Sequence, residues 1–343
     1  MYYSAGTYES FARPEKPKDA DKKSAYIIGT GLAGLSAAFY LVRDGQVKGE
    51  HIHLLEKLDL AGGSCDGRKD ITKGFFMRGG REMDNHFECM WDMFRDVPSI
   101  ETPGVSVLDE YYWLNKRDPR EGKVTTGGIV TVKDSTDNWY LSWTINRQPQ
   151  FRSQDRNTVL VWLYSLNTNK EGNYVKKAMR DCTGEEVCRE WLYHIGVPDE
   201  RIEELAKSAC NTTTCYMPYI NAFFQPRKES DRPKVVPDGA VNFAFLGQFA
   251  ETPRDTIFTT EYSIRTGMEA VYTLLCVDRG VPEVWGSKYD VRELLRACYY
   301  AIDKKPITDV KLSFGEKELL KVVMKKVKGT DVELLLRESG LIK

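Results

Sequence analysis

The run SAYIIGTGLAGLSAAFYLVR, residues 24–43, places three glycines between a short apolar segment and a helix-forming segment of small residues. Gly29 allows a tight turn, Gly31 lets the backbone approach a pyrophosphate, and Gly34 lets helix and strand pack closely. The helix N-terminus adds free N–H groups and the positive end of the helix dipole. A second apolar run, HIHLLE, ends at Glu56, which is placed to accept hydrogen bonds from a ribose hydroxyl. This order predicts a β-α-β unit that binds a dinucleotide.

A membrane-spanning helix is the rival interpretation, because residues 25–42 carry no charge and approach membrane-spanning length. The glycines, together with Thr30 and Ser36, interrupt the apolar side chains, and the flanks have no signal-peptide layout. The nucleotide-binding interpretation is therefore preferred.

Composition narrows the classes of function. The chain has 343 residues, enough for one large or two ordinary domains. Its 49 basic and 50 acidic side chains nearly cancel, so no bulk field would attract nucleic acid. The 8 cysteines form no CxxC pair and no histidine lies at ligand spacing from them, so we predict no metal site. Without a secretory signal, they are expected to be reduced thiols in a cytoplasmic protein.

A second glycine cluster, AGGSCDG at residues 61–67, follows Glu56 closely. Such a cluster is typical of FAD-binding folds rather than of soluble NAD dehydrogenases, with ordinary loop glycines as the alternative. Near the other end, VNFAFL (241–246) is predicted to be a buried strand that ends at Gly247, followed by a long helix near 260–277. Flavoproteins of this kind build one cofactor site from both ends of the chain. We therefore predict an α/β, Rossmann-like FAD-binding flavoprotein fold.

The middle of the chain has a different pattern. A helix is expected over residues 84–96, and a charged, proline-containing linker over 115–123. The sequence GGIVTVK-DSTDN-WYLSWTINR predicts a β-hairpin, which residues 158–165 join as a third strand. One face of the hairpin is expected to carry Trp139, Leu141, Trp143 and Ile145, and the other Tyr140, Ser142, Thr144 and Asn146. Thr183 and Glu186 form a capping-box pattern at the start of a helix.

The C-terminal segment is helical and rich in lysine. Its apolar positions are Leu320, Val323, Met324 and Val327, and its basic positions are Lys317, Lys321, Lys325 and Lys328. Two interpretations are open: a solvated amphipathic helix docked on the protein, or a membrane-surface helix that contacts anionic lipid.

Several long motifs connect the chain with a known family. They are RGGREMDNHFEC, MYYSAGTYESFARP, VLDEYYWLNK, TINRQPQF, EWLYHIGV and FAETPRDTIFTTEYSIRTGMEAVY. Over nearly its whole length the chain closely resembles the oleate hydratases, also called myosin-cross-reactive antigens. The resemblance implies FAD bound without net redox chemistry, and addition of water across the cis-9 double bond of oleate or a related fatty acid to give a 10-hydroxy acid. It also implies a homodimer.

The resemblance assigns catalysis to Glu82, which matches the carboxylate thought to orient or activate the water. A carboxylate held near reduced flavin can accept a proton from water that attacks an alkene carbon. A salt bridge to Arg78 or Arg81 is the alternative role for this carboxylate. Met83 matches the neighbour whose position changes as flavin binds.

The resemblance also implies substrate-binding and cofactor-binding sets. Thr144, Asn146 and Gln150 match a stretch used near the fatty-acid carboxylate, with an exposed sheet face as the alternative. Relatives can carry histidine at position 150, so a cationic contact is lost here. The residues expected to bind FAD are Gly29, Gly31, Leu32, Ala33, Gly34, Glu56, Gly63, Ser64, Arg81, Glu82, Met83, Gly247, Phe249, Glu251, Thr260 and Ser263.

The chain departs from the family in its centre. A long segment lies in the family between the WLNK motif and the GGI strand, and it carries the tyrosine proposed to protonate the alkene. Here Lys116-Arg117-Asp118-Pro119 runs almost directly into that strand. We expect an internal deletion joined at a short repeated sequence near 117–123, which leaves catalytic turnover in question and apolar surface exposed.

The predicted organisation follows from this. Residues 1–115 would be the N-terminal part of the FAD-binding domain, and 116–180 a small antiparallel β-sheet remnant of the substrate domain. Residues 181–280 would hold a helical segment and the C-terminal part of the FAD-binding domain, and 281–343 a helical tail. Three functions remain open: a fatty-acid hydratase, a non-catalytic FAD-binding or membrane-associated fragment, and a redox flavoenzyme of the amine-oxidase or desaturase type.

Overall fold

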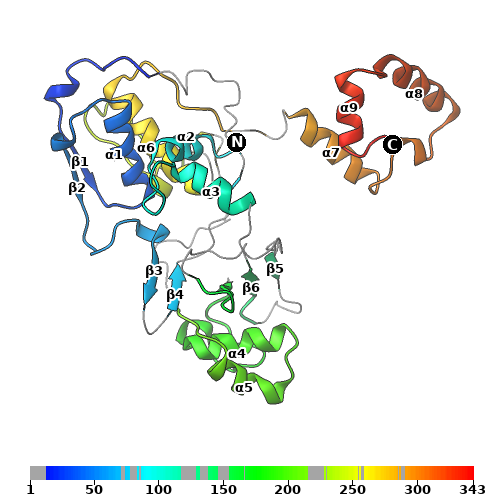
Figure 1. Cartoon of the computed structure of the whole chain (residues 1–343), viewed down its shortest axis with the longest axis horizontal. Coiled ribbons are helices and arrows are strands. Elements are labelled where there is room, and N and C mark those ends of the chain that lie inside the picture. The colour runs from blue at the N-terminus through cyan, green and yellow to red at the C-terminus, as the bar shows by residue number, and fades with distance from the viewer. Residues whose placement is uncertain are drawn as a thin grey trace. The chain divides into compact units, whose positions relative to one another are not determined.

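The computed structural model describes residues 13–70, 74–77, 83–84, 86–116, 129–131, 138–145, 154–165, 167–214, 228, 230–253, 255, 259–284, 286 and 290–343. The chain divides into two compact units, Met1–Pro282 and Glu283–Lys343, and Figure 1 labels their helices and strands. The first unit contains both glycine clusters, and the second contains the lysine-rich helix.

The N-terminal β-α-β unit forms as the glycine pattern predicts. β1 (Ala25–Ile28) pairs in parallel with β2 (Ile52–Leu55), and α1 (Leu32–Arg43) connects them. Because side chains alternate along a strand, Ile27 is buried while Ile28 on the opposite face is 88% exposed. The described residues therefore cover only one face of this two-stranded sheet.

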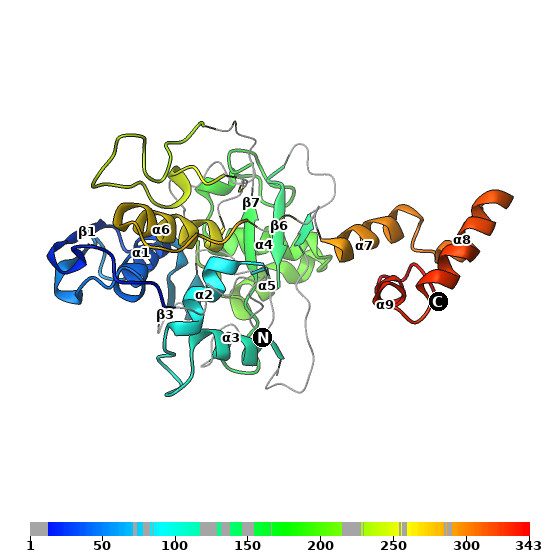
Figure 2. The same cartoon turned by 90° about the horizontal axis from the view of Figure 1, so that it is seen from above.

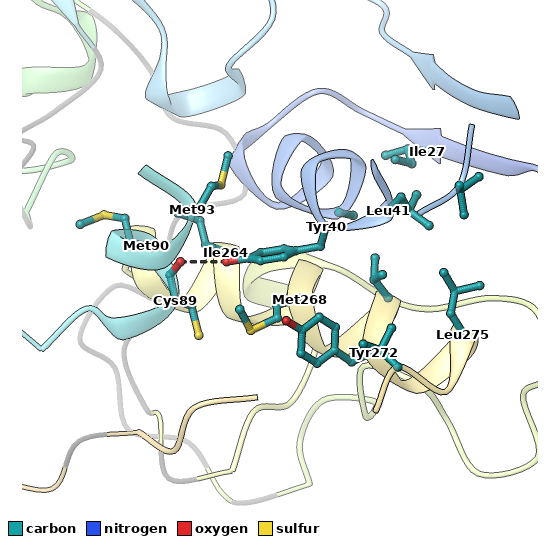
Figure 3. Close-up of a cluster of buried hydrophobic side chains, with 14 of the residues drawn as sticks. Ile27, Tyr40, Leu41, Cys89, Met90, Met93, Ile264, Met268, Tyr272 and Leu275 are labelled. Atoms are coloured by element: carbon teal, nitrogen blue, oxygen red, sulfur yellow. Dashed lines mark hydrogen bonds between the residues drawn. The ribbon is translucent and has the colours of Figure 1, made fainter. Parts of the chain in front are cut away.

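The core of the first unit lies between α1, α2 (Glu88–Asp96) and α6 (Thr260–Leu275). α1 and α6 lie side by side in Figures 1 and 2. Their close approach depends on small residues, because a Cβ at Gly267 of α6 would collide with the Ser36 side chain of α1. In Figure 3 the Tyr40 hydroxyl reaches from α1 to α2, where it donates a hydrogen bond of 2.9 Å to the Cys89 carbonyl.

α2 begins later than the sequence pattern predicts, at position 88 rather than 84. Glu261 of α6 determines this start, because its buried carboxylate accepts hydrogen bonds from the N–H groups of Cys89 (3.1 Å) and Met90 (2.8 Å). These are donors that the first turn of a helix leaves without a backbone partner. α3 (Val107–Lys116) packs on the outer side of α2, where the Trp91 and Tyr111 rings lie 5.1 Å apart.

A buried ion-pair network joins the end of α1 to α2. The carboxylate of Asp92, 2% exposed, lies 2.6 Å from Arg43 Nη2 and 3.1 Å from Arg95 Nη2. The Tyr40 hydroxyl is a third donor, at 3.2 Å from the same carboxylate. Burial of this charge is tolerated because hydrogen-bond donors surround it.

We expect Asp92→Asn to lower the free energy of unfolding by about 2 kcal/mol, because a neutral amide weakens the ion pairs and presents a donor to other donors. Asp21→Asn is the matched control, since its pair with Lys16 is exposed and such pairs contribute little. Urea unfolding measures both. Equal losses in the two variants would contradict the assigned role of the buried network.

Two small antiparallel sheets follow in the first unit. β3 (Gly67–Asp70) pairs with β4 (Gly74–Met77) in a hairpin. The second sheet has the order β5 (Ile129–Thr131), β6 (Leu141–Thr144), β7 (Trp162–Ser165). The predicted hairpin with a third strand is therefore confirmed.

The exposed sheet face, given as the alternative to substrate binding, is not found at Ser142. Trp139 and Leu141 on one face are each 1% exposed, and Ser142 on the opposite face is also 1% exposed. Tyr140 has a positive φ of 53°, so the regular alternation begins only at the first residue of β6. The sheet is covered on both sides at this position.

The helical segment of the first unit is an α-hairpin of α4 (Gly184–His194) and α5 (Asp199–Ser208). Thr183 and Glu186 make the predicted reciprocal capping box at the start of α4. On its inner face, Glu190 is 0% exposed.

The Glu190 carboxylate is the centre of a closed hydrogen-bond network. It accepts backbone N–H groups of residues 173, 174 and 175 at 2.6–2.8 Å and lies 2.9 Å from His194 Nε2. Burial alone would raise the pKa of Glu190, but the hydrogen bonds from His194 and from the three backbone groups lower it below its ordinary value of 4.5.

A lowered pKa means that Glu190 contributes stability above about pH 4.5 and that this contribution is lost as the pH falls. We expect Glu190→Gln to cost about 2 kcal/mol at pH 7, because the amide NH₂ faces donors. The difference between native chain and variant should shrink as the pH falls from 5 towards 3, roughly the range in which a carboxylate is protonated. Glu185→Gln, in an i,i+4 pair with Arg189, is the control. A pH-independent difference in urea unfolding would disprove this role of the Glu190 charge.

The predicted buried strand at 241–246 is wrong. These residues form no β-ladder, and Val241 and Phe243 are 84% and 51% exposed. Phe245 N–H donates to the Val235 carbonyl at 2.8 Å, which is a single contact rather than a strand pairing. The apolar sequence reflects a strand preference that no neighbouring strand satisfies among the described residues.

The second unit, Glu283–Lys343, contains α7 (Val291–Ala301), α8 (Phe314–Val327) and α9 (Asp331–Glu338). α8 is the predicted lysine-rich helix, and Ser313 and Glu316 form a capping box at its start. Several of its apolar side chains are exposed. Among the described residues, no helix combines the length and apolar character needed to cross a bilayer.

Candidate functional site

The first glycine cluster forms a tight turn between β1 and α1. Gly29 has φ 90°, a value that favours glycine, and its N–H donates to the Leu55 carbonyl at 2.7 Å. A Cβ at Gly34 would collide with the Gly29 carbonyl oxygen, so the helix can approach the turn only without a side chain there. Gly31 is the N-cap of α1 and has no side chain to cap the first turn. Among the described residues, no atom lies within 4 Å of a Cβ added at Gly31.

The second glycine cluster lies directly against the first. The Gly62 N–H donates to the Thr30 carbonyl at 2.8 Å, and Gly31 and Gly62 form a parallel bridge. A Cβ at Gly63 would come within 2.9 Å of the Gly31 Cα atom. Ser64 follows in the 3-10 turn Gly63–Cys65. The two clusters therefore make one backbone surface at the N-terminus of α1.

Glu56 lies at the same edge, but protein groups already engage its carboxylate. Oε2 accepts the N–H (2.8 Å) and hydroxyl (2.6 Å) of Thr30, and Oε1 accepts the N–H groups of Lys57 and Leu58. The Thr30 side-chain hydrogen bond is the largest of several that lower the pKa of Glu56 to about 2. Glu56 thus holds the glycine turn in place, in addition to the ribose contact predicted for it.

The C-terminal part of the first unit reaches this surface through Gly247. Its N–H donates to the Thr266 hydroxyl of α6 at 2.8 Å, and its φ is 75°. A Cβ on Gly247 would lie 3.6 Å from the Ala33 Cβ in the first turn of α1. The structure therefore brings the predicted cofactor residues of the two distant chain segments together.

Comparison with known proteins gives the family. The model of the MCRA family matches residues 22–125 and 121–272. An oleate hydratase of Streptococcus pyogenes serotype M49 (strain NZ131) is 33% identical over 593 aligned positions, which cover 100% of both chains. This chain belongs to the MCRA family. A linoleate hydratase of Lactiplantibacillus plantarum is 34% identical over 139 residues, 38% of this MCRA protein and 24% of that hydratase.

Two further features of these matches concern the continuity and the length of this MCRA protein. The family model matches in two segments, which meet at residues 121–125. The alignment with the oleate hydratase has 593 positions against 343 residues in this chain, a difference of 250. At least that many positions of the alignment therefore hold no residue of this MCRA protein.

The remaining residues predicted to bind the cofactor have different surroundings. Leu32 and Met83 pack against the α1–α2–α6 core, whereas Phe249, at the end of the 3-10 turn Gly247–Phe249, is 59% exposed. Glu251 N–H donates to the Pro233 carbonyl at 2.7 Å. At the start of α6, the Thr260 hydroxyl contacts Met90 Sδ at 3.4 Å, and the Ser263 carbonyl accepts the Thr266 hydroxyl at 2.8 Å.

Four predicted site residues lie outside the described residues: Arg81, Glu82, Asn146 and Gln150. Thr144 is the last residue of β6, where it pairs with Ile129 and Trp162. The catalytic and substrate-binding assignments therefore stay predictions.

A pair of buried acids, Glu88 at the start of α2 and Glu261 in the first turn of α6, was not predicted. Glu88 and Glu261 are both buried, and Arg265 Nη2 lies 2.7 Å from Glu261 Oε1. Burial, and then the nearby Glu261 charge, raises the pKa of Glu88 to about 7. The available sequence signal was an i,i+4 Glu–Arg pair in an otherwise apolar helix. Within the described parts, no three His, Cys, Asp or Glu side chains gather as a metal site.

Proposed function

We propose that this MCRA protein binds FAD at the surface formed by its two glycine clusters, and that its hydration of unsaturated fatty acids is strongly reduced. The observation that carries the proposal is the convergence of Gly31, Gly63 and Gly247 at the N-terminus of α1. The names of the relatives, oleate hydratase and linoleate hydratase, support the substrate class.

The residues at this surface fit a dinucleotide. The first turn of α1 offers N–H groups and the positive end of the helix dipole to a pyrophosphate. Among the described residues, no atom lies within 4 Å of a Cβ added at Gly29 or Gly31, which leaves room for it. Glu56 would accept a ribose hydroxyl by exchanging one of its hydrogen bonds to Thr30. The N-terminus of α6 lies beside α2, where Met83 packs, and would face the ring system of the cofactor.

In the proposed reaction, water adds across the cis-9 double bond of oleate or a related acid and gives a 10-hydroxy acid. When bound, FAD would organise the site without net redox change. Glu82 would accept a proton from the attacking water, and an acid must protonate the other alkene carbon. Thr144, Asn146 and Gln150 would hold the fatty-acid carboxylate.

The residue expected to act as this acid has no counterpart in the chain. The two family segments that meet at 121–125 and the 250 unmatched positions support a central deletion that removes the expected donor tyrosine. Sequencing of the source DNA across the codon of Pro119 tests this directly. An uninterrupted longer reading frame would show that the short chain is not the natural protein.

FAD binding is tested by the visible spectrum of the purified chain after incubation with FAD and removal of free cofactor. A retained flavin spectrum is expected. Gly31→Val should abolish it while leaving unfolding nearly unchanged, because the added side chain enters open space that the pyrophosphate would occupy. No retained flavin in the native chain would overturn the proposal.

A redox flavoenzyme is the second class to be separated by experiment. Bleaching of the flavin by an amine or fatty-acid substrate, or release of peroxide, would favour it over hydration. Formation of a hydroxy acid without net change in flavin redox state would exclude it.

We further propose that the protein is cytoplasmic, that it contacts the membrane surface peripherally, and that it forms a homodimer. On α8, the exposed side chains of Phe314 (82%) and Leu319 (65%) share a helix with lysines, which favours peripheral contact with anionic lipid. Sedimentation with anionic but not neutral vesicles tests the contact. Light scattering tests the homodimer expected from the family, and a monomeric mass would contradict it.

A further inference from the structure

Two cysteines meet in the α4–α5 hairpin, away from the glycine clusters. Cys188, on α4, is 2% exposed, and Cys210, just beyond α5, packs against the same cluster of apolar side chains. Both are free thiols, and Cys210 is the more exposed of the two. Burial, and then the neighbouring Cys210 thiol, raises the pKa of the Cys188 thiol.

The backbone explains why these thiols meet. After α5 the chain turns back against the start of α4, so closely that a Cβ at Gly184 would collide with the Thr212 carbonyl oxygen. Gly184 and Cys188 are four residues apart and therefore share one face of α4. Cys210 lies two residues before Thr212 and packs against the apolar cluster that contains Cys188, so the folded chain brings both cysteines into one cluster.

We propose that Cys188 and Cys210 form a reversible dithiol–disulfide site, oxidised by a low-molecular-weight disulfide. Pairs of this kind in reducing compartments are typically transient and redox-sensing rather than permanent staples. The proposal is independent of FAD binding and of hydration.

The chemistry proceeds by two thiol–disulfide exchanges. The Cys210 thiolate attacks one sulfur of the small disulfide, forms a mixed disulfide and releases one small thiolate. The Cys188 thiolate then attacks the Cys210 sulfur, forms the protein disulfide and releases the second small thiolate. The two protein protons end on the two released thiols. The protein loses two electrons and the small disulfide gains them.

The surroundings of each sulfur assign this order. Cys210 is accessible, whereas burial and then the hydrogen bond with Cys210 raise the pKa of Cys188 to about 12. Cys188 is therefore the resolving thiol, and its attack should be the slower step. That attack should accelerate as the pH rises from 7 to 9, over which the thiolate fraction grows roughly tenfold per unit.

The experiment treats the full chain with oxidised glutathione and maps its peptides by mass spectrometry without reduction. We expect a Cys188–Cys210 disulfide that dithiothreitol reverses. Cys188→Ser should retain at least about tenfold more glutathione on Cys210 than the native chain, since nothing resolves the adduct. Cys276→Ser is the matched control, because it removes an exposed thiol and should leave the disulfide unchanged.

Three results would overturn the proposal. They are a lasting glutathione adduct on Cys210 of the native chain, a disulfide of Cys210 with Cys215, and no modification of Cys210 while Cys276 reacts. Because the decisive peptide comes from the native chain, a variant that folds poorly does not affect the conclusion.

Discussion

Purified chain supplied with FAD, a reductant and oleate is expected to form the 10-hydroxy acid at least about 10²-fold more slowly than the Streptococcus pyogenes oleate hydratase under the same conditions. Hydration needs a base to guide water and an acid to protonate the other carbon. In the proposed reaction Glu82 would take the first role, and the proposed central deletion would remove the residue expected for the second. Mass spectrometry of the extracted fatty acids measures the product.

Two controls make this result specific to the missing acid. Glu82→Gln should lower any remaining rate further, because a residual enzymatic reaction still depends on the base. Insertion of the relative's unmatched central segment near Pro119 should raise the rate, provided that the chain binds FAD to begin with. A rate in the native chain within about tenfold of the relative's would show that another group donates the proton.

A low rate of hydration has two possible causes, loss of the proton-donating acid or loss of FAD binding, and the amount of retained flavin distinguishes them. A chain that shows a flavin spectrum but little product has kept its cofactor site and lost the chemistry. A chain that shows neither has lost the site, which would overturn FAD binding rather than the argument about the acid.

The sequence predicted the parts of the fold whose cause is local. The turn at Gly29, the capping box of Thr183 with Glu186, and the helix after position 259 depend on backbone conformation and on hydrogen bonds between near neighbours. These signals are complete within a few residues, so they do not depend on distant parts of the chain.

The errors come from long-range contacts. VNFAFL has the composition of a buried strand, but strand formation needs a neighbouring strand, and residues 241–246 have none among those described. The start of α2 is set by Glu261, which is far away in the chain. No local pattern at 84–88 could have revealed it.

At the candidate site, too, the local features could be predicted from the sequence and the long-range contacts could not. Glycine spacing located the turn proposed to bind the pyrophosphate, and the structure places Gly63 against Gly31 and Gly247 near Ala33 in the first turn of α1. Glu56 was recognised as the acid at the end of β2, but its two hydrogen bonds from Thr30 could not be deduced, because Thr30 is 26 residues away in the chain. The Glu56 carboxylate therefore connects the end of β2 to the glycine turn by hydrogen bonds.

Gly34→Ala gives the largest stability effect that we expect from the glycine cluster. Helix propensity alone predicts a gain of about 1 kcal/mol, since alanine is the better residue inside a helix. The structure predicts the opposite sign, because the new Cβ would collide with the Gly29 carbonyl oxygen and lie 3.1 Å from Ile27 Cγ2. Both neighbours are fixed, one by the turn and the other by the core, so α1 must move away from β1. We expect a net loss of about 3 kcal/mol.

Gly34→Ala should also lower the FAD affinity by at least about tenfold, because a shift of α1 displaces the N–H groups that would face the pyrophosphate. Gly49→Ala is the matched control: no described atom lies within 4 Å of its Cβ, and stability and affinity should be unchanged. Comparison with Gly31→Val then separates two functions of one motif. Gly31→Val should lose flavin and keep its stability, whereas Gly34→Ala should lose both. If Gly34→Ala instead became more stable, the gain in helix propensity would outweigh the collision. Gly34 would then not be needed for the close approach of α1 to the glycine turn.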